Sequence, residues 1–556
     1  MANQKIKYRG LEENLPYGNE LREYLANKEE TGINVFSPSA NKVRFRDKMD
    51  RYPCTLLVMP PITLSEGTVK RVIPPLGLGY IGGYLESVGI PFDILDCVVE
   101  GLDTEQLIGD RTWMYGLSDE AIREYFVRFR PEIVGISIIY SSDLHSMYRL
   151  ARLAKEVNRD VVVVVGGIHC SIYPREVLEE SCPHIDFVIR GEGELRLAEF
   201  IENFREGYLD LGADGLCGWH EGKMFINHQV KTITNLDELP FPAYHRLPME
   251  KYFEFNVPFS PFPQGKRVMQ LYTSRGCPVG CTFCASTNFN KAYRGRSPES
   301  VIKEILYYKD IYQIDEIQFA DDSLTFNRKR SMELFEALKT CGLPWCTPNG
   351  TMVNTLTQQM LDKMIASGLY QVTLSLDSGN AKTLKEHHRK PVDLQRVPDL
   401  AKYLKDKGIL IHATLVVGMP GETLDDIEEG YRYVESLPLD SIGVFIAQAL
   451  PGSELFEKAV SAGLIDRKKA RIIDTAQSNI SLSNIEREVL EKNVADFLFK
   501  YNETMRKRDP ISWDRKYKRH RDRLAKICIG NAAPNTEAII RAAQPAPMEN
   551  YSYWVG

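Results

Sequence analysis

The stretch Ser274-Arg275-Gly276-Cys277-Pro278-Val279-Gly280-Cys281-Thr282-Phe283-Cys284 carries the strongest signal in this 556-residue chain. It directly follows Val268–Thr273, an apolar run that predicts a β-strand. Three thiolates this close together can converge on one soft metal centre, and iron–sulfur clusters favour thiolate ligands. Gly276 and Gly280 supply the backbone freedom that a loop wrapped around a cluster requires. The residues predicted to hold a four-iron cluster, with one iron left open, are Cys277, Cys281 and Cys284.

Zinc binding and chance spacing are the alternatives for these cysteines. A structural zinc site normally has four ligands. The nearest histidines in the chain, His245 and His387, are far from the cysteines in sequence. The cluster is therefore the preferred interpretation.

Around the cysteines, short apolar runs alternate with helical patterns from residue 263 to residue 456. This alternation predicts an incomplete parallel (β/α)6 barrel with its chemistry on the loops after the strands. Residues 457–556 are predicted to be mostly helical. The predicted strands are Val268–Thr273, Glu316–Phe319, Trp345–Thr347, Gln371–Leu376, Ile409–Val417 and Ser441–Ala447.

A second α/β unit is predicted upstream, over residues 51–215. Runs rich in Val and Ile, separated by helical patterns, predict a doubly wound, Rossmann-like parallel sheet that binds its ligand at the carboxyl ends of its strands. Residues 1–50 form an N-terminal extension without a recognisable motif, and residues 216–262 are predicted to be a linker. The predicted strands are Thr55–Met59, Phe92–Leu95, Ile133–Ile138, Val161–Val165 and Phe187–Ile189.

The amino-acid composition limits the classes of protein to which this chain can belong. Hydrophobic residues make up 43% and charged residues 26%, as in a globular protein. The net charge of -6 argues against a general binder of nucleic acid or of membrane surfaces. The first residues carry no apolar core after their charges, so a secretory signal is not expected, and the longest apolar run is too short to predict a spanning helix. The 11 cysteines suit reduced thiols or metal ligands better than a disulfide framework, so a cytoplasmic location is expected.

The spacing Cys-x3-Cys-x2-Cys, with an aromatic residue before the third cysteine, resembles the signature of the radical S-adenosylmethionine (SAM) superfamily. The resemblance implies that the open iron binds SAM and that the reduced cluster cleaves it to a 5′-deoxyadenosyl radical. It further implies contacts to SAM at later strand ends, although Asp377 stands where a glutamate is more usual. The implied contacts are Asp321 and Asp322 to the amino group, Ser375 and Asp377 to the ribose, and Gly418 on the adenine side.

The first unit resembles the cobalamin-binding domain that is fused to one branch of this superfamily. The loop after its first strand, Met59–Thr63, has no histidine, so cobalamin is expected to lack a protein histidine ligand. His145 is interpreted as a surface residue at a helix start. The residues that the resemblance assigns to the cobalamin slot are Leu76, Gly77, Gly79, Ser137, Gly166, Gly167, Gly191 and Glu192.

Several stretches resemble the cobalamin-dependent radical SAM methyltransferases of phosphonate antibiotic pathways, which include a C-methyltransferase of the fosfomycin pathway and a P-methyltransferase of phosphinothricin-type pathways. The resemblance spans about Arg51 to Asn502. It implies methyl transfer from SAM, through methylcobalamin, to an unactivated carbon or phosphorus centre of a small molecule, with an external reductant such as flavodoxin or ferredoxin. The stretches are Met114–Asp119, Met249–Phe253, Gln270–Cys277, Gly342–Trp345 and Tyr370–Leu374.

Other interpretations stay open at this point. The same cofactors could perform oxidative cyclisation or ring rearrangement, and a non-enzymatic cobalamin sensor would explain the first unit but not the three cysteines. Cys346 is a candidate hydrogen donor or base, against the alternative that it is a small buried hydrophobe. The basic segment 500–526 could attract an anionic substrate, or it could be a solvated helix face.

Overall fold

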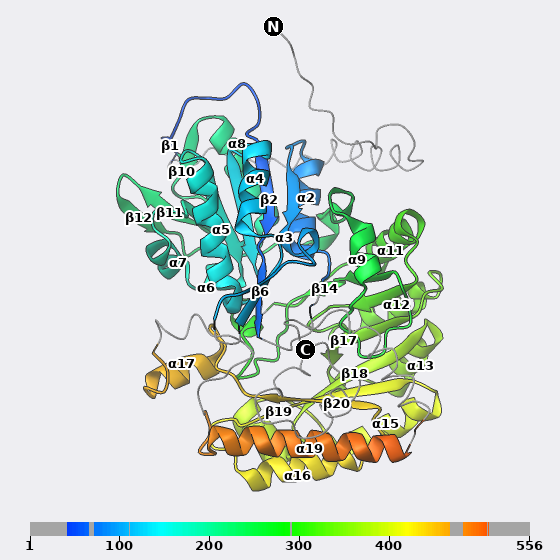
Figure 1. Cartoon of the computed structure of the whole chain (residues 1–556). Helices are drawn as coiled ribbons and strands as arrows, with labels where there is room; N and C mark the ends of the chain where they lie inside the picture. The colour runs from blue at the N-terminus through cyan, green and yellow to red at the C-terminus, as the bar shows by residue number, and fades with distance from the viewer. Residues whose placement is uncertain are drawn as a thin grey trace.

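The computed structural model describes residues 42–65, 70, 72–109, 112–289, 292–466, 482–508 and 510. Two α/β units lie one above the other in Figure 1, the first in blue to cyan and the second in green to yellow. Most of the predicted N-terminal extension lies outside the described residues. Its end, β1 (Lys42–Arg44), pairs with β10 (Tyr208–Asp210) of the first unit.

The first unit contains a seven-stranded sheet in which β4, β2, β7, β8 and β9 run parallel in that order. The topological switch point, where ligands bind in such sheets, lies between β2 and β7. This confirms the doubly wound sheet. The strands are β2 (Thr55–Met59), β4 (Asp93–Asp96), β7 (Ile133–Ile138), β8 (Val162–Gly167) and β9 (Phe187–Ile189).

Apolar residues on both faces of these strands are covered by helices, which is why the strands read as continuous Val, Ile and Leu runs. A three-stranded sheet of β3 (Ile62–Ser65), β6 (Thr112–Tyr115) and β5 (Glu105–Leu107) lies beside them. The helices are α2 (Leu76–Ser87), α3 (Cys97–Glu100), α4 (Asp119–Phe129), α5 (Leu144–Val157), α6 (Ile168–Ile172), α7 (Pro174–Glu180) and α8 (Gly193–Arg205).

The segment predicted to begin the linker is part of this sheet. Strands β11 (Leu216–His220) and β12 (Lys223–Ile226) form a hairpin that continues the sheet antiparallel from β9. Its two-residue turn, Glu221-Gly222, has positive φ at both residues (48° and 71°), which is the conformation that suits a tight hairpin. The first unit therefore extends to residue 226, and this turn was the sequence signal for it.

The second unit is a six-stranded parallel sheet in the order β13-β16-β17-β18-β19-β20. The strands follow one another in chain order, as in a barrel that stops after six βα repeats, which confirms the partial barrel. The strands are β13 (Val268–Leu271), β16 (Glu316–Phe319), β17 (Trp345–Thr351), β18 (Leu369–Asp377), β19 (Leu410–Val417) and β20 (Ser441–Ile446). The helices between them are α11 (Pro298–Tyr312), α12 (Arg328–Leu338), α13 (Gln358–Ala366), α15 (Val397–Asp406) and α16 (Leu424–Glu435).

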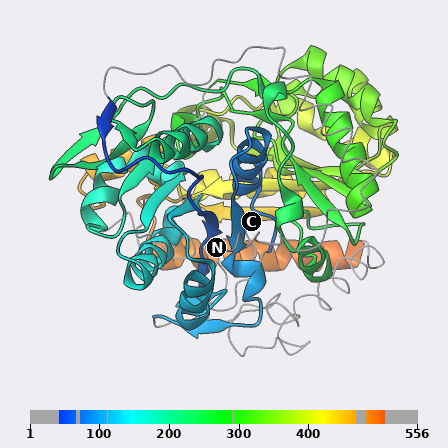
Figure 2. The same cartoon turned by 90° about the horizontal axis from the view of Figure 1, so that it is seen from above.

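Beyond the barrel, the described part of the chain is mainly helical, with α17 (Glu454–Ser461) and α19 (Arg487–Arg508). Helix α19 lies along α16, where the rings of Phe497 and Tyr431 stack with centroids 3.7 Å apart (Figures 1 and 2). The predicted basic segment 500–526 begins at the end of α19, and most of it lies outside the described residues. No described helix is long and apolar enough to cross a membrane.

Candidate active site between the two units

The cysteine loop is closed at its base by two short strands. Strand β14 (Ser274–Arg275) pairs antiparallel with β15 (Arg294–Gly295), and the loop between them carries the three cysteines. Gly276 and Gly280 have φ of 92° and 81°, which a residue with a side chain rarely adopts. All three cysteines are half-buried. In Figure 1, β14 lies at the junction of the two units.

The donor set fits an iron–sulfur cluster. Among the described residues, no group of three His, Cys, Asp or Glu side chains is arranged to hold a single metal ion. A four-iron cluster, by contrast, takes its cysteines at separate irons. Burial raises the pKa of the Cys281 thiol to about 12, although the ammonium of Lys390 opposes the shift. Cys277, Cys281 and Cys284 therefore remain the proposed ligands.

A segment about 100 positions further along the chain holds the middle of the cysteine loop. Thr282 donates from its backbone N to the His388 carbonyl (3.1 Å) and from Oγ1 to the His387 carbonyl (2.6 Å). The Phe283 ring meets the His388 ring edge-on, with centroids 5.4 Å apart. These histidines lie in a single π-helical turn, Leu384–His388, a feature that is frequent at functional sites. Sequence reasoning missed this contact because no local pattern links the two segments.

Asp321 and Asp322 follow β16, but only one of them is open. Asp321 is buried and accepts hydrogen bonds from Thr273 N (3.0 Å), Thr273 Oγ1 (2.7 Å) and the Ser274 hydroxyl. Its carboxylate therefore anchors the start of β14. Asp322 is exposed and has no hydrogen bond or ion pair with any described residue. Next to it, the buried Ser323 hydroxyl also lacks a partner among the described residues. Asp322 is thus the one of the pair that is available to a ligand.

The two predicted ribose contacts also differ. Asp377 is buried and forms an ion pair with Lys390, and it adopts a φ of 59°. Its carboxylate is therefore used inside the protein, contrary to the expectation that it faces a ribose. Ser375 is half-buried and its hydroxyl has no partner in the described part of the chain. Gly350 makes room for it, since a Cβ there would lie 2.0 Å from Ser375 Oγ.

Gly418 ends β19 in a tight turn that is closed by a carboxylate. The N–H groups of Gly418 and Met419 donate to Glu422 Oε2 at 2.6 and 3.0 Å. Burial raises the pKa of Glu422 to about 7. A Cβ at Gly418 would lie 2.4 Å from Leu490 of α19, so a glycine is needed for helix packing as well as for its φ of 81°.

The predicted cobalamin edge lies at the carboxyl ends of β7 and β8. Ser137 pairs with Gly166 and Ile138 with Gly167 across these strands. Ser137 is half-buried and its hydroxyl has no described partner. Near the start of α2, Leu76 is half-buried, and Gly77 is exposed with nothing within 4 Å of a Cβ. His145 is exposed on α5, as expected.

Three residues assigned to cobalamin instead hold segments of the protein together. A Cβ at Gly79 would lie 2.9 Å from Pro242 Cβ, and one at Gly191 would lie 2.4 Å from Val230 Cγ1, so both glycines permit close packing of the connecting segment. The Glu192 carboxylate is bound by Arg275 and Arg294 of the cysteine loop. These observations correct the expectation that the side chain of Glu192 and the space beside Gly79 and Gly191 belong to the ligand.

Cys346 lies at the wrong end of the barrel for chemistry. It is the second residue of β17, it is fully buried, and it lies beside Tyr370 and Ser260, whose hydrogen bonds to it moderate the raised pKa that burial produces. Active sites of such barrels form at the carboxyl ends of the strands. This position does not support the predicted catalytic role and favours the alternative that Cys346 is a small buried hydrophobe.

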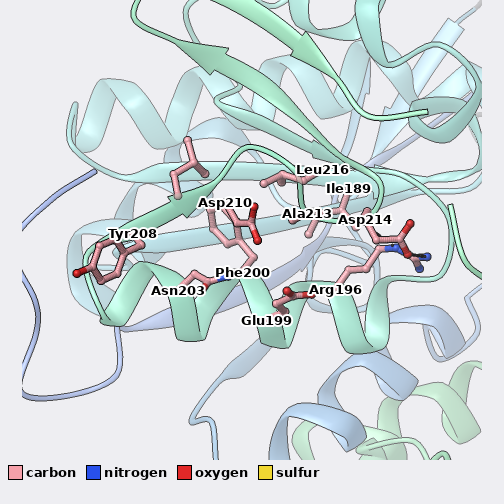
Figure 3. Close-up of a pocket in the computed structure, with 11 residues that line it drawn as sticks. Ile189, Arg196, Glu199, Phe200, Asn203, Tyr208, Asp210, Ala213, Asp214 and Leu216 are labelled. Carbon is pink, nitrogen blue, oxygen red and sulfur yellow. Dashed lines mark hydrogen bonds and ion pairs between the residues drawn. The ribbon is translucent and has the colours of Figure 1, made fainter. Parts of the chain in front are cut away.

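A crevice between α8, β10 and β11 lies apart from this region (Figure 3). Its main charged groups pair with one another, since Arg196 binds Asp214 at 2.5 Å. No residue predicted to bind a cofactor lines it, so we do not include it in the site.

The sequence matches two families in the same order as the two units. The B12 binding domain family matches residues 65–201, and the radical SAM superfamily matches residues 271–434. The chain is 36% identical over 451 residues to cytidylyl-2-hydroxyethylphosphonate methyltransferase of Streptomyces wedmorensis, covering 76% of this chain and 84% of that protein. The chain belongs to the cobalamin-dependent radical SAM methyltransferases.

A second relative agrees with this family, and a solved structure shares the fold. An uncharacterized methyltransferase of Pyrococcus horikoshii is 32% identical over 444 residues, covering 79% of this chain and 90% of that protein. The radical SAM methyltransferase TsrM of Kitasatospora setae shares the fold, with a TM-score of 0.60 and 17% identity over 74% of this chain and 77% of that one. As a member of the family, this methyltransferase uses a [4Fe-4S] cluster, SAM and cobalamin.

Proposed function

We propose that this methyltransferase acts on a phosphonate or phosphinate intermediate of natural-product biosynthesis and methylates an unactivated carbon or phosphorus centre. The observation that carries the proposal is the 36% identity to cytidylyl-2-hydroxyethylphosphonate methyltransferase across 84% of that protein's length. So extended a match includes the barrel interior and the facing sheet, where a substrate would lie.

In this proposal the barrel mouth and the carboxyl edge of the first sheet enclose the reaction space. Tyr272, at the end of β13, has its pKa raised by burial, with further contributions from Asp322 and from Tyr140, which follows β7. Tyr140 and Tyr272 come from different units, so the two edges face each other. Enclosure between two units excludes water, and this protects reactive intermediates.

The residues that would hold the cofactors come from both edges. Cys277, Cys281 and Cys284 would bind the cluster, Asp322 would accept a hydrogen bond from the ammonium of SAM, and Ser375 would contact its ribose. Ser137, Gly166, Gly167, Leu76 and Gly77 would line the cobalamin slot. When bound, the cluster and SAM supply a radical, and cobalamin carries the methyl group. Charged hydrogen bonds such as that of Asp322 orient a ligand strongly because its ammonium is ionised.

The proposal includes a redox partner and a reducing compartment. Reducing the cluster requires an external electron donor such as flavodoxin or ferredoxin. Cys97, Cys170 and Cys217 of the first unit are free thiols, which supports a location in the cytoplasm. We further propose that the basic segment 500–526 attracts an anionic substrate.

An anaerobic assay of the reconstituted enzyme tests the function. Cytidylyl-2-hydroxyethylphosphonate and a phosphinate analogue are each supplied with SAM, cobalamin and dithionite. We expect 5′-deoxyadenosine and S-adenosylhomocysteine to accumulate together with a product that has gained one methyl group. A product that has lost hydrogens, without homocysteine, would instead establish cyclisation or rearrangement. A purified protein without iron and sulfide would point to a cobalamin sensor.

A further inference from the structure

The strands at the base of the cysteine loop carry two facing arginines. Arg275 of β14 and Arg294 of β15 are register partners in the antiparallel pair. One precedes the loop and the other follows it, and Arg275 stands two positions before Cys277. Whatever binds both arginines therefore holds both ends of the loop.

Both arginines bind one carboxylate of the first unit. Arg275 Nη1 lies 2.8 Å from Glu192 Oε1, and Arg294 Nη1 lies 2.8 Å from Glu192 Oε2. The second Nη of Arg275 reaches Glu194 Oε1 at 2.7 Å. We call Glu192, Glu194, Arg275 and Arg294 the clasp.

Other parts of the protein fix the geometry of the clasp. The N–H of Ile233, in the connecting segment, donates to Glu192 Oε2 at 2.8 Å. The Arg275 guanidinium lies over the Tyr80 ring of α2, 5.1 Å from its centroid, within reach of a cation–π interaction. Three separate segments of the first half of the chain thus hold the two arginines.

The clasp is buried and charged. The side chains of Glu192 and Arg294 are each 8% exposed. Burial alone would raise the pKa of Glu192, but the hydrogen bond from Arg294 and the charge of Arg275 hold it below its usual value. Breaking a buried ion pair by removing one partner is costly because the remaining charge is left uncompensated. The arrangement therefore specifies one position of the loop.

The two ends of the clasp adjoin the two proposed cofactor sites. Glu192 follows β9 by three residues, at the sheet edge that also carries Ser137, Gly166 and Gly167. Arg275 begins the loop with the three cysteines. We propose that Glu192 is a positioning residue that fixes the cysteine loop against this sheet edge, so that the cluster with its SAM and the cobalamin are held at one mutual distance. This inference rests on the proposed sites of both cofactors.

Glu192→Gln tests the proposal, because it removes the charge and keeps the size of the side chain. The variant is reconstituted with iron, sulfide and cobalamin, and pulsed EPR measures the distribution of distances between the reduced cluster and cob(II)alamin. We expect normal iron and cobalamin contents but a broader and shifted distribution. With a substrate that the wild-type enzyme methylates, the ratio of methylated product to 5′-deoxyadenosine should fall. The fall should reach about 100-fold if the cluster and cobalamin are displaced by about 1 Å relative to each other.

Glu100→Gln is the matched control. Glu100 of α3 pairs with Lys251 of α9 (Met249–Phe255) at 2.6 Å, which also joins the first unit to the segment before the barrel, but this pair is partly exposed and does not involve the cysteine loop. The distribution of cluster–cob(II)alamin distances in Glu100→Gln should match that of the wild type.

Arg275→Lys keeps the proposal testable if Glu192→Gln does not fold. A lysine retains the charge but lacks the fork that spans Glu192 and Glu194, so the distribution should again broaden. If either folded variant binds both cofactors and still gives the wild-type distribution of distances, the proposed positioning role of Glu192 is overturned. A wild-type protein that holds no cluster or no cobalamin would instead contradict the proposed function, so the two failures are distinguishable.

Discussion

At the amino end of the barrel, polar side chains are buried and satisfied by one another, whereas at the carboxyl end several are left without a protein partner. Glu316 is fully buried and accepts hydrogen bonds from Gln264 N and Gly265 N, both at 2.6 Å, and from the Tyr370 hydroxyl at 2.7 Å. The carboxyl end shows the opposite in Asp322, Ser323 and Ser375, whose side chains have no hydrogen bond with described residues.

This difference separates folding from function within one sheet. A buried polar group without a partner, such as the Ser323 hydroxyl, costs free energy unless a ligand provides the missing hydrogen bond. The exposed Asp322 and the half-buried Ser375 are open to the same ligand. The amino end is closed by the segment Phe259–Gly265, which leaves no polar group for a ligand to satisfy at Glu316 or Gln318. Substitutions at the two ends should therefore affect different measurements.

The largest effect is expected from serine at Cys277, Cys281 and Cys284 together. Serine hydroxyls are poor ligands for iron–sulfur clusters, which favour thiolates. The purified variant should lack iron, sulfide and brown colour, and it should form neither 5′-deoxyadenosine nor methylated product. Cys182→Ser, at an exposed free cysteine, is the control and should keep both. Iron retained in the triple variant would show that the ligands are elsewhere.

Glu316→Ala should give the largest loss of stability at the amino end. It removes the acceptor of two backbone N–H groups and the nearer acceptor of the buried Tyr370 hydroxyl, and it leaves a cavity at a fully buried position. The free energy of unfolding should therefore fall by about 3 kcal/mol or more. Urea unfolding followed by circular dichroism measures this. Glu333→Ala, at an exposed position of α12, is the control. Equal stability of the two variants would contradict the role of the amino end.

Asp322→Asn should weaken SAM binding without a loss of stability. Replacing a charged acceptor by a neutral one removes part of a charge-assisted hydrogen bond, so KM for SAM in 5′-deoxyadenosine formation should rise on the order of tenfold. Asp321→Asn should behave in the opposite way, with lower stability, because the buried Asp321 holds the start of β14. If Asp321→Asn instead weakened SAM binding and Asp322→Asn lowered stability, the roles assigned to the two aspartates would be reversed.

Glu422 should make stability depend on pH near neutrality. Its pKa in the folded protein is about 7, above the ordinary value of 4.5, so the folded state binds the proton more tightly than the unfolded state. Its contribution is present below pH 4.5 and is lost as the pH rises through about 7. In Glu422→Gln, the urea midpoint should change less between these pH values than in the wild type. An unchanged pH profile would show that Glu422 does not carry the effect.

The smallest effect is expected from Cys346→Ala. The substitution removes one sulfur from a buried site, so the free energy of unfolding should fall by about 1 kcal/mol. The yields of 5′-deoxyadenosine and of methylated product should remain those of the wild type. A large loss of turnover in a stable variant would return Cys346 to the chemistry.

Local patterns predicted the architecture well because they report burial. Apolar runs of Val and Ile predicted β2, β7 and β8, and the regular alternation with helices predicted the six barrel strands. The hairpin β11–β12 was missed, although the Glu221-Gly222 turn signalled it, because its strands mix polar and apolar residues. A strand is recognised from its hydrophobic pattern, and a short strand of mixed polarity has almost none.

The sequence by itself determined that three cysteines lie together on a loop after a barrel strand, because their spacing is local. Only the tertiary structure decided that Asp321 is buried while Asp322 stays exposed. It also decided that Lys390 forms an ion pair with Asp377, and that Glu192 binds Arg275 and Arg294. The pairings of Asp321 and Asp377 depend on how the loops of the barrel meet, whereas those of Glu192 join segments of two different units. No run of neighbouring residues specifies how loops meet or how two units pack.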